Sequence, residues 1–192
     1  MIKDRGNKTI ATKASGVVAP EGVSFDGVTD YLSRSTDLVG NVDSKTFTFS
    51  CWVYVKDDKS DTHFILGVGD SEATYLIYRT GKFTFQGYDS SVTNSVSLVI
   101  GTQDLDRYEN HYVHLLISFD LTDTNKRHVY VNDIVPTNLW DSYSNIAINF
   151  AGNGGHYIGT KYNAGDKFKG RLSNLFLDYT YRDLSIEANR RL

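Results

Sequence analysis

The sequence predicts an all-β protein, folded as a two-sheet antiparallel β-sandwich of the jelly-roll type. Apolar residues alternate with polar ones in many short segments, and polar turns separate these segments. Aromatic residues make up 13% of the 192 residues, which is typical of β-rich chains. Outside a short turn near the C-terminus, no window repeats at the 3.6-residue period of a helix.

The alternating segments are the predicted strands. In the clearest one, Thr46–Val55 (TFTFSCWVYV), every second residue from Phe47 to Val55 is apolar, so one face of the strand is expected to enter the core. Further strands are expected at 64–68, 74–78, 82–86, 96–100, 113–119, 129–131, 146–150, 156–159 and 168–172.

Short polar pairs between these segments have the composition of tight turns. Asn132-Asp133 suits a two-residue hairpin turn, because Asn and Asp tolerate a positive φ. Thr80-Gly81 is expected to join two strands in the same way. A helical turn is expected at the C-terminus, with Ser185 as its N-cap and Glu187 near the positive end of its dipole.

Length and composition indicate one domain, residues 21–192, preceded by a polar, Lys-rich segment of residues 1–20. This segment is interpreted as an arm that orders on a partner or as a frayed terminus. The net charge of −3 argues against coating of nucleic acid, which needs clustered Lys and Arg. Cys51 is the only cysteine, and its place in an alternating strand predicts a buried, inert thiol.

The N-terminus has no apolar segment typical of a signal peptide, and no apolar run approaches the length that spans a bilayer. We therefore expect synthesis in a cytoplasm and no insertion into a membrane.

Five motifs, in order, resemble those of laminin G-like and pentraxin-like domains, which share the concanavalin A-like jelly roll. They are residues 22–32 (GVSFDGVTDYL), 47–53 (FTFSCWV), 112–115 (YVHL, with Tyr112 where Trp is usual), 129–133 (VYVND) and 156–185, where an Ile-Gly strand is followed by FKGRL and YRDLS. The resemblance covers nearly the whole chain. It implies the concanavalin A-like fold, and a function in binding or assembly rather than catalysis.

The tail, residues 181–192 (YRDLSIEANRRL), is also similar to a segment of laminin G-like domains in phage structural proteins. This similarity implies a virion component such as a tail, fibre or capsid-decoration protein, made in the bacterial host cytoplasm. Other virion proteins are then the expected partners, together with a host-surface polysaccharide. A homo-oligomer or multicopy arrangement is expected, because such proteins act through symmetry and multivalency.

A glycoside hydrolase on the same fold is the alternative from another class. Such enzymes use paired carboxylates in an E-x-D-x-x-E strand, and Asp104, Asp106 and Glu109 have that spacing. Asp104 is shorter than the expected Glu, however, and the segment lies in a polar connection, so a solvated loop is favoured. Gly69-Asp70-Ser71 lacks the partner motif of an esterase, and the glycine-rich residues 152–155 precede a strand rather than a phosphate-binding helix.

Metal binding has two sequence candidates. His111 and His114 are three residues apart on a strand and point to opposite faces, so His114 is assigned a structural role. Calcium prefers carboxylate and carbonyl oxygens, and Asp57, Asp58 and Asp61 share one loop. Asp26, Asp30 and Asp166 supply further carboxylates elsewhere. Because Asp also favours turns for local hydrogen bonding, a structural calcium is kept only as an alternative, and no cofactor is expected.

Carbohydrate recognition combines an aromatic ring, which stacks on the apolar face of a sugar, with polar side chains that bind its hydroxyls. Trp140, Asp141, Tyr143 and Asn145 provide this combination in one segment. Further aromatic candidates are Tyr75, Tyr78, Tyr88 and the Trp52/Tyr54 face of the strand 46–55. The resemblance implies a non-enzymatic virion surface protein that contacts other virion proteins, with Trp140, Asp141, Tyr143 and Asn145 as candidate glycan contacts. Burial of these aromatic residues against overlying loops is the other interpretation. A cellular carbohydrate-binding module cut from a larger polypeptide remains a further alternative.

Overall fold

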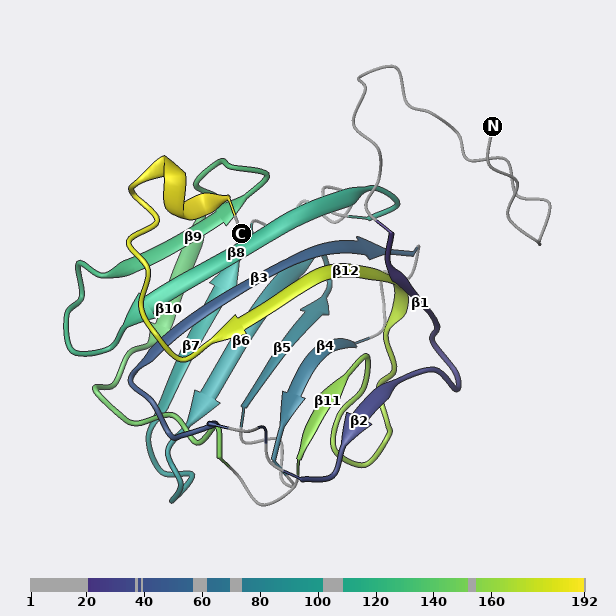
Figure 1. The fold of residues 1–192 in the computed structure, drawn as a ribbon, viewed down its shortest axis with the longest axis horizontal. Helices are drawn as coiled ribbons and strands as arrows, with labels where there is room; N and C mark the ends of the chain where they lie inside the picture. Colours follow the sequence, from purple (N-terminus) through teal and green to yellow (C-terminus); the bar gives the residue numbers. More distant parts are fainter. Residues whose placement is uncertain are drawn as a thin grey trace.

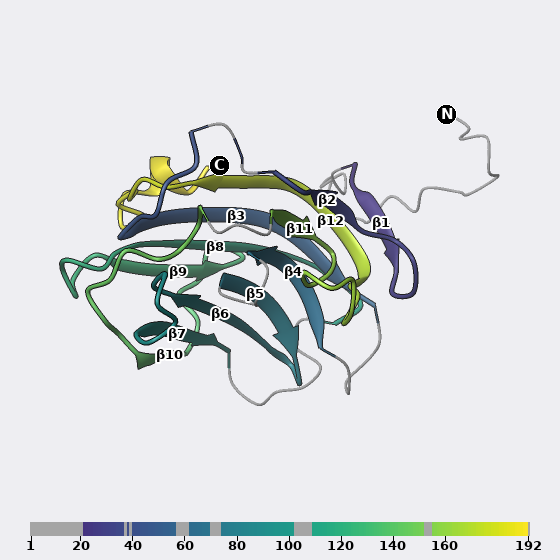
Figure 2. The same cartoon turned by 90° about the horizontal axis from the view of Figure 1, so that it is seen from below.

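The computed structural model describes residues 21–36, 38, 40–56, 62–69, 74–101, 109–151 and 155–191. Within these ranges the chain forms the predicted all-β fold, with two antiparallel sheets that face each other across one core. The strands β3, β8 and β12 cross in front of β4–β7 in Figure 1, and Figure 2 shows the layers from the edge. The fold class predicted from the alternation is confirmed.

The first sheet has five strands in the order β1-β12-β3-β8-β9. Their bounds are β1 (Val23–Asp26), β12 (Lys169–Asp178), β3 (Thr46–Val55), β8 (Tyr112–Asp120) and β9 (Arg127–Val131). The second sheet has seven strands in the order β10-β7-β6-β5-β4-β11-β2. Their bounds are β10 (Asn138–Ser142), β7 (Ser95–Ile100), β6 (Lys82–Tyr88), β5 (Thr74–Arg79), β4 (His63–Val68), β11 (His156–Ile158) and β2 (Leu32–Arg34).

The core lies between the sheets and is rich in aromatic rings. Phe47 of β3 is fully buried, with its ring centroid 5.0 Å from that of Phe85, 5.4 Å from that of Phe119 and 5.2 Å from that of Phe150. Cys51 is buried on the same face of β3, as its alternation predicts. Side chains of both sheets therefore pack against the inward-facing apolar residues of β3.

The predicted hairpin turns are present, with left-handed backbone where the sequence predicts it. Asn132 and Asp133 have φ of 52° and 63°, and Thr80 and Gly81 have φ of 49° and 79°. Gly170 of the FKGRL motif is required for close approach, since a Cβ there would lie 1.9 Å from the carbonyl oxygen of Tyr54.

Two local predictions are wrong. Residues 146–150 form no strand: Ile148 makes only an isolated bridge with Ser44, although its side chain is buried. The alternation predicted burial correctly, but this segment crosses the end of the sandwich instead of joining a sheet. The C-terminal helical turn is η1 (Glu187–Arg190), and its N-cap is Ile186 rather than Ser185. The Ser185 hydroxyl instead donates to Asp183 Oδ1 at 2.6 Å.

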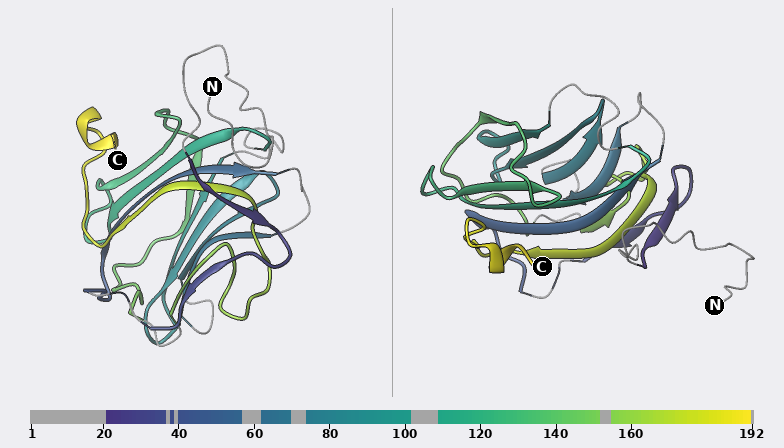
Figure 3. Two further views of the ribbon diagram at one scale, coloured as in Figure 1. Left: turned by 45° about the vertical axis from the view of Figure 1, so that its right-hand side comes forward. Right: turned by 90° about the horizontal axis from the view of Figure 1, so that it is seen from above.

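The C-terminal segment after β12 packs on the outer face of the five-stranded sheet (Figure 3). The Arg182 amide donates to Ser118 Oγ at 2.9 Å, and Leu184 is fully buried. Arg190 lies with its guanidinium 4.7 Å from the ring of Tyr130 and pairs with Asp133. In the part of the chain that the structure describes, no helix is long and apolar enough to cross a membrane.

Candidate carbohydrate-binding site

Trp140 and Tyr143 meet at the edge of the sandwich formed by β9 and β10. Trp140 pairs with Leu98 of the adjacent strand, and its ring stands edge-on to the buried ring of Phe119 at 5.8 Å. The Tyr143 ring is 5.5 Å from Trp140 at an interplanar angle of 84°. Both side chains are partly buried and pack against the core. The two rings therefore close this edge and remain in reach of solvent.

Hydrogen bonds fix the position of Tyr143. Its hydroxyl donates to the carbonyl oxygen of Asp120 at 3.0 Å, which lies at the end of β8. Burial raises the pKa of Tyr143 above its ordinary value, while the nearby Arg127 acts in the opposite direction. The hydroxyl is consequently a donor at neutral pH, and this hydrogen bond holds the ring beside Trp140.

Arg127 brings a positive charge to the two rings. Its guanidinium carbon lies 4.7 Å from the Tyr143 ring and 5.5 Å from the Trp140 ring, which is cation–π range. Asp141 and Asn145 are exposed on either side of Tyr143 in the sequence. The edge therefore combines rings, a guanidinium, a carboxylate and an amide. The sequence does not predict Arg127 at this site, because Arg127 lies on β9 in the other sheet. It approaches the Trp140 and Tyr143 rings only when the two sheets pack together.

The second aromatic face lies on the outside of the five-stranded sheet. The ring of Trp52 stacks on His114 at 5.0 Å, and that of Tyr54 lies 5.3 Å from Tyr112. His114 Nε2 is 2.8 Å from Ser50 Oγ, and burial lowers its pKa, so the ring is neutral at pH 7. These contacts agree with a structural role for His114. Each aromatic ring of β3 on this face packs against a ring of β8, so part of its surface is not accessible to a sugar.

The predicted hydrolase residues are only partly placed. Asp104 and Asp106 lie outside the described residues. Glu109 is 5% exposed and accepts a hydrogen bond of 3.1 Å from the Tyr78 hydroxyl. Tyr78 is fully buried, so the prediction that it is a surface candidate for sugar binding is wrong. Tyr75 and Tyr88, the other two tyrosines of that set, are partly exposed.

The calcium candidates Asp57, Asp58 and Asp61 also lie outside the described residues, as do Asp70, Ser71 and residues 152–154. Among the other candidate carboxylates, Asp26 accepts hydrogen bonds from the amides of residues 28, 29 and 30, which hold its pKa well below the ordinary value. Asp166 pairs with Lys161 at 2.7 Å. The described residues contain no cluster of three His, Cys, Asp or Glu side chains that could hold a metal ion.

Comparisons with known proteins agree with this architecture. The model of the family described as the concanavalin A-like lectin/glucanases superfamily matches residues 26–177. Comparison with curated protein sequences gave no match.

Among solved structures, domains LG4-5 of the mouse laminin α1 chain are 17% identical with a TM-score of 0.59, over 88% of this chain and 44% of that one. NanB sialidase from Streptococcus pneumoniae is 15% identical with a TM-score of 0.61, over 89% of this chain and 27% of that one. The CBM40 domain of Ruminococcus gnavus IT-sialidase, bound to α2,3-sialyllactose, is 10% identical with a TM-score of 0.60, over 88% of this chain and 94% of that one. The chain thus spans less than half of the laminin and NanB chains, and these likenesses concern the fold.

Proposed function

We propose that this chain, which belongs to the concanavalin A-like lectin/glucanases superfamily, is a non-catalytic glycan-binding domain. The observation that carries the proposal is the Trp140–Tyr143 ring pair beside Arg127, with Asp141 and Asn145 exposed next to it. A sugar ring offers an apolar C–H face to an aromatic side chain, and its hydroxyls need donors and acceptors. The edge formed by β9 and β10 supplies both.

Fixed geometry favours binding at this edge. A site whose side chains are already ordered loses less conformational entropy when a ligand arrives. Tyr143 is held through its hydroxyl, and Arg127 is held by a hydrogen bond from its Nε to the carbonyl oxygen of Thr124 at 2.6 Å. The polar groups of Asp141 and Asn145 remain open to solvent, where a ligand can reach them.

The environment of Glu109 supports the non-catalytic part of the proposal. A catalytic acid or nucleophile must reach the substrate, whereas Glu109 is buried against Tyr78 and forms a bridge through its backbone with Val55. We therefore expect no release of reducing sugar when the purified protein is incubated with polysaccharides. Turnover that Glu109→Gln abolishes would instead establish the hydrolase alternative.

The binding site can be located by fluorescence, because the chain has only two tryptophans, Trp52 and Trp140. A glycan array, probed with and without calcium, first identifies a ligand. Titrated into Trp52→Phe, this glycan should change the emission of Trp140. Titrated into Trp140→Phe, it should leave the emission unchanged and bind about tenfold more weakly, which corresponds to about 1.4 kcal/mol.

A control variant is Tyr162→Ala, which removes an exposed aromatic ring from the loop after β11. It should bind the glycan as the unaltered protein does. Emission changes confined to Trp52 would move the site to the outer face of the five-stranded sheet. Absence of signal on the array under both conditions would remove glycan binding altogether.

We also propose that the domain functions in a virion, in several copies. Support comes from the similarity of residues 181–192 to a segment of phage structural proteins. Mass spectrometry of purified particles and the oligomeric state in solution test this proposal. A monomer that is absent from particles, with its gene beside polysaccharide-degrading enzymes, would favour the carbohydrate-binding module.

A further inference from the structure

An apolar groove opens between the two sheets at the edge opposite to Trp140. Two adjoining cavities of about 380 and 290 Å³ share Leu32 of β2, Ile158 of β11 and Leu175 of β12. Cavities of roughly 300 Å³ and more are large enough to hold a small organic ligand. The groove is open to solvent, since Leu32 is 52% and Leu175 38% exposed.

The pairing of β4, β11 and β2 sets the floor of this groove. Ile158 lies opposite Leu66 on one side and Leu32 on the other, so three aliphatic side chains form one row across the strands. His156 lies opposite Arg34 in the neighbouring row, and the two-residue period of a strand puts both on the same face. The groove therefore has an aliphatic stretch with an imidazole and a guanidinium at one end.

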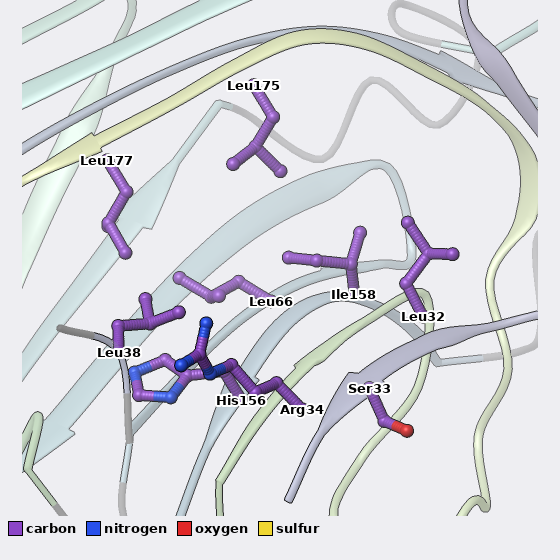
Figure 4. A pocket seen from close by; sticks show the side chains of 9 residues that line it. All are labelled: Leu32, Ser33, Arg34, Leu38, Leu66, His156, Ile158, Leu175 and Leu177. Atoms are coloured by element: carbon purple, nitrogen blue, oxygen red, sulfur yellow. The ribbon is translucent and has the colours of Figure 1, made fainter. Parts of the chain in front are cut away.

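Leucine side chains of the opposite sheet face the aliphatic row. Figure 4 shows Leu175 and Leu177 pointing from β12 towards Leu66 and Ile158. Apart from three polar residues, the larger cavity is lined by Leu and Ile side chains only. Such side chains offer no hydrogen bond to a polar ligand group, whereas methylene groups are stabilised when they leave water. The lining therefore favours an aliphatic chain over a sugar.

Arg34 supplies a positive charge at the end of the groove. It is exposed, and its Nε donates to Thr36 Oγ1 at 3.3 Å. Among the residues that the structure describes, no carboxylate forms an ion pair with Arg34. A guanidinium stays charged at any ordinary pH, and its fork of N–H donors matches a carboxylate. This end of the groove therefore favours an anionic ligand group.

The smaller cavity continues the groove along β12, away from Arg34. Its lining includes Phe25 and Leu172, which are 5% and 4% exposed, and Glu21. The Glu21 carboxylate disfavours a second negative charge at this far end, so an anionic chain has one preferred orientation. From Leu177 to Leu172, β12 runs roughly 15 Å. An extended alkyl chain advances about 1.3 Å per carbon, since C–C bonds are about 1.5 Å long, so a chain of about ten carbons fits.

We propose that this groove binds a fatty acid of medium chain length. The carboxylate pairs with Arg34, and the alkyl chain passes Ile158 and Leu175 towards Phe25. Such a ligand covers aliphatic side chains that are otherwise open to water, and it brings a negative charge to the guanidinium. The groove lies at the opposite end of the seven-stranded sheet from Trp140, so this proposal does not depend on glycan binding.

Titration calorimetry of the full chain at neutral pH tests the role of the charge. Decanoate, decanol and decyltrimethylammonium, each below its micellar concentration, carry the same chain with different head groups. Decanoate should bind about threefold to fivefold more tightly than decanol, the range for an ion pair partly open to solvent, and the cation should bind most weakly. Arg34→Gln should remove the difference between decanoate and decanol. Arg171→Gln, at an exposed position of β12 on the outer face, is the matched control and should keep it.

Three outcomes of this titration would overturn the proposal. They are no binding of any of the three compounds, equal binding of decanoate and decanol to the unaltered protein, and a difference between them that survives in Arg34→Gln.

Methyl NMR spectra locate the alkyl chain. Decanoate should shift the signals of Leu66, Ile158 and Leu175, and it should leave that of Ile134, which is 63% exposed after β9. Leu175→Asp replaces an apolar contact by a carboxylate and should weaken decanoate and decanol alike by about tenfold, whereas Ile134→Asp should weaken neither.

Shifts confined to other methyl groups, or unchanged affinity in Leu175→Asp, would overturn the assignment of the groove. Binding to phosphatidylglycerol vesicles without any shift by free decanoate would also overturn it, and would assign the groove to a membrane surface instead.

Discussion

Replacing Phe47 with alanine tests whether the two sheets are held together by one aromatic core. Phe47 is 0% exposed and contacts the rings of Phe85, Phe119 and Phe150, which come from both layers of the sandwich and the segment across its end. A buried Phe→Ala substitution costs about 3–5 kcal/mol, and aromatic pairs add roughly 0.5–1.5 kcal/mol each to simple burial. We therefore expect Phe47→Ala to lower the free energy of unfolding by about 4–5 kcal/mol, near the upper end of this range.

Urea unfolding measures this loss. With a slope of about 2 kcal/mol per M, the midpoint of Phe47→Ala should fall by roughly 2 M. Since a domain of this size has about 5–15 kcal/mol of stability, the variant should still fold.

The control for this measurement is Tyr31→Ala. The Tyr31 ring is 42% exposed and its centroid lies 4.2 Å from Lys167 Nζ. Removing it should therefore lower the free energy of unfolding by less than about 1 kcal/mol. A shift for Phe47→Ala as small as that of the control would refute the assignment of Phe47 to the core.

Three further predictions concern single groups. Tyr78→Phe removes the hydrogen bond to Glu109 and should cost about 1–3 kcal/mol in thermal unfolding, and an unchanged stability would contradict a buried contact. The Asn94 amide lowers the pKa of Asp89 to about 2, below the pKa of about 4 that this carboxyl has in the unfolded chain. The ionised carboxylate therefore stabilises the native protein above about pH 4, and this contribution to the free energy of unfolding is lost as pH falls from about 4 to 2. An NMR titration midpoint near 4 would contradict this prediction. Burial raises the pKa of Cys51 to about 12, so the native protein should resist thiol reagents at pH 8, and rapid labelling would contradict it.

Much of the fold was predictable from the sequence because the period-2 pattern reports burial. Phe47 to Val55 alternate over a whole strand, and every one of these inward residues is buried. The pattern does not report pairing, however. Ile148 alternates and is buried like a strand residue, yet its backbone pairs only with Ser44, which lies before β3, so it forms only an isolated bridge.

The pattern is also ambiguous where both faces of a strand are apolar. In β5, Tyr75, Ile77 and Arg79 face outwards, and Leu76 and Tyr78 face the core. Tyr75 and Tyr78 lie on opposite faces of the strand, and both faces carry apolar residues. Alternation alone therefore cannot tell which tyrosine faces the core. Only the register of β5 with β4 and β6 settles it. The sequence therefore does not identify Tyr78 as a core residue, and only the structure shows that it is fully buried.

The candidate site was predictable only as far as it is local. Trp140, Asp141, Tyr143 and Asn145 come together because they are neighbours in the sequence. Arg127 joins them through the contact between β9 and β10, and the partner of the Tyr143 hydroxyl is a backbone carbonyl. No side-chain pattern identifies either contact.

The sandwich presents different side chains at the edge formed by β9 and β10 and at the edge between β12 and β2. At the β9–β10 edge, Trp140, Tyr143 and Arg127 fill the gap between the layers, so this edge presents two aromatic rings and a guanidinium. At the edge between β12 and β2, apolar side chains stay open to water, and each Å² of such surface costs about 25 cal/mol until it is covered. The two edges therefore differ in chemistry, since one presents aromatic rings and a guanidinium and the other presents aliphatic side chains.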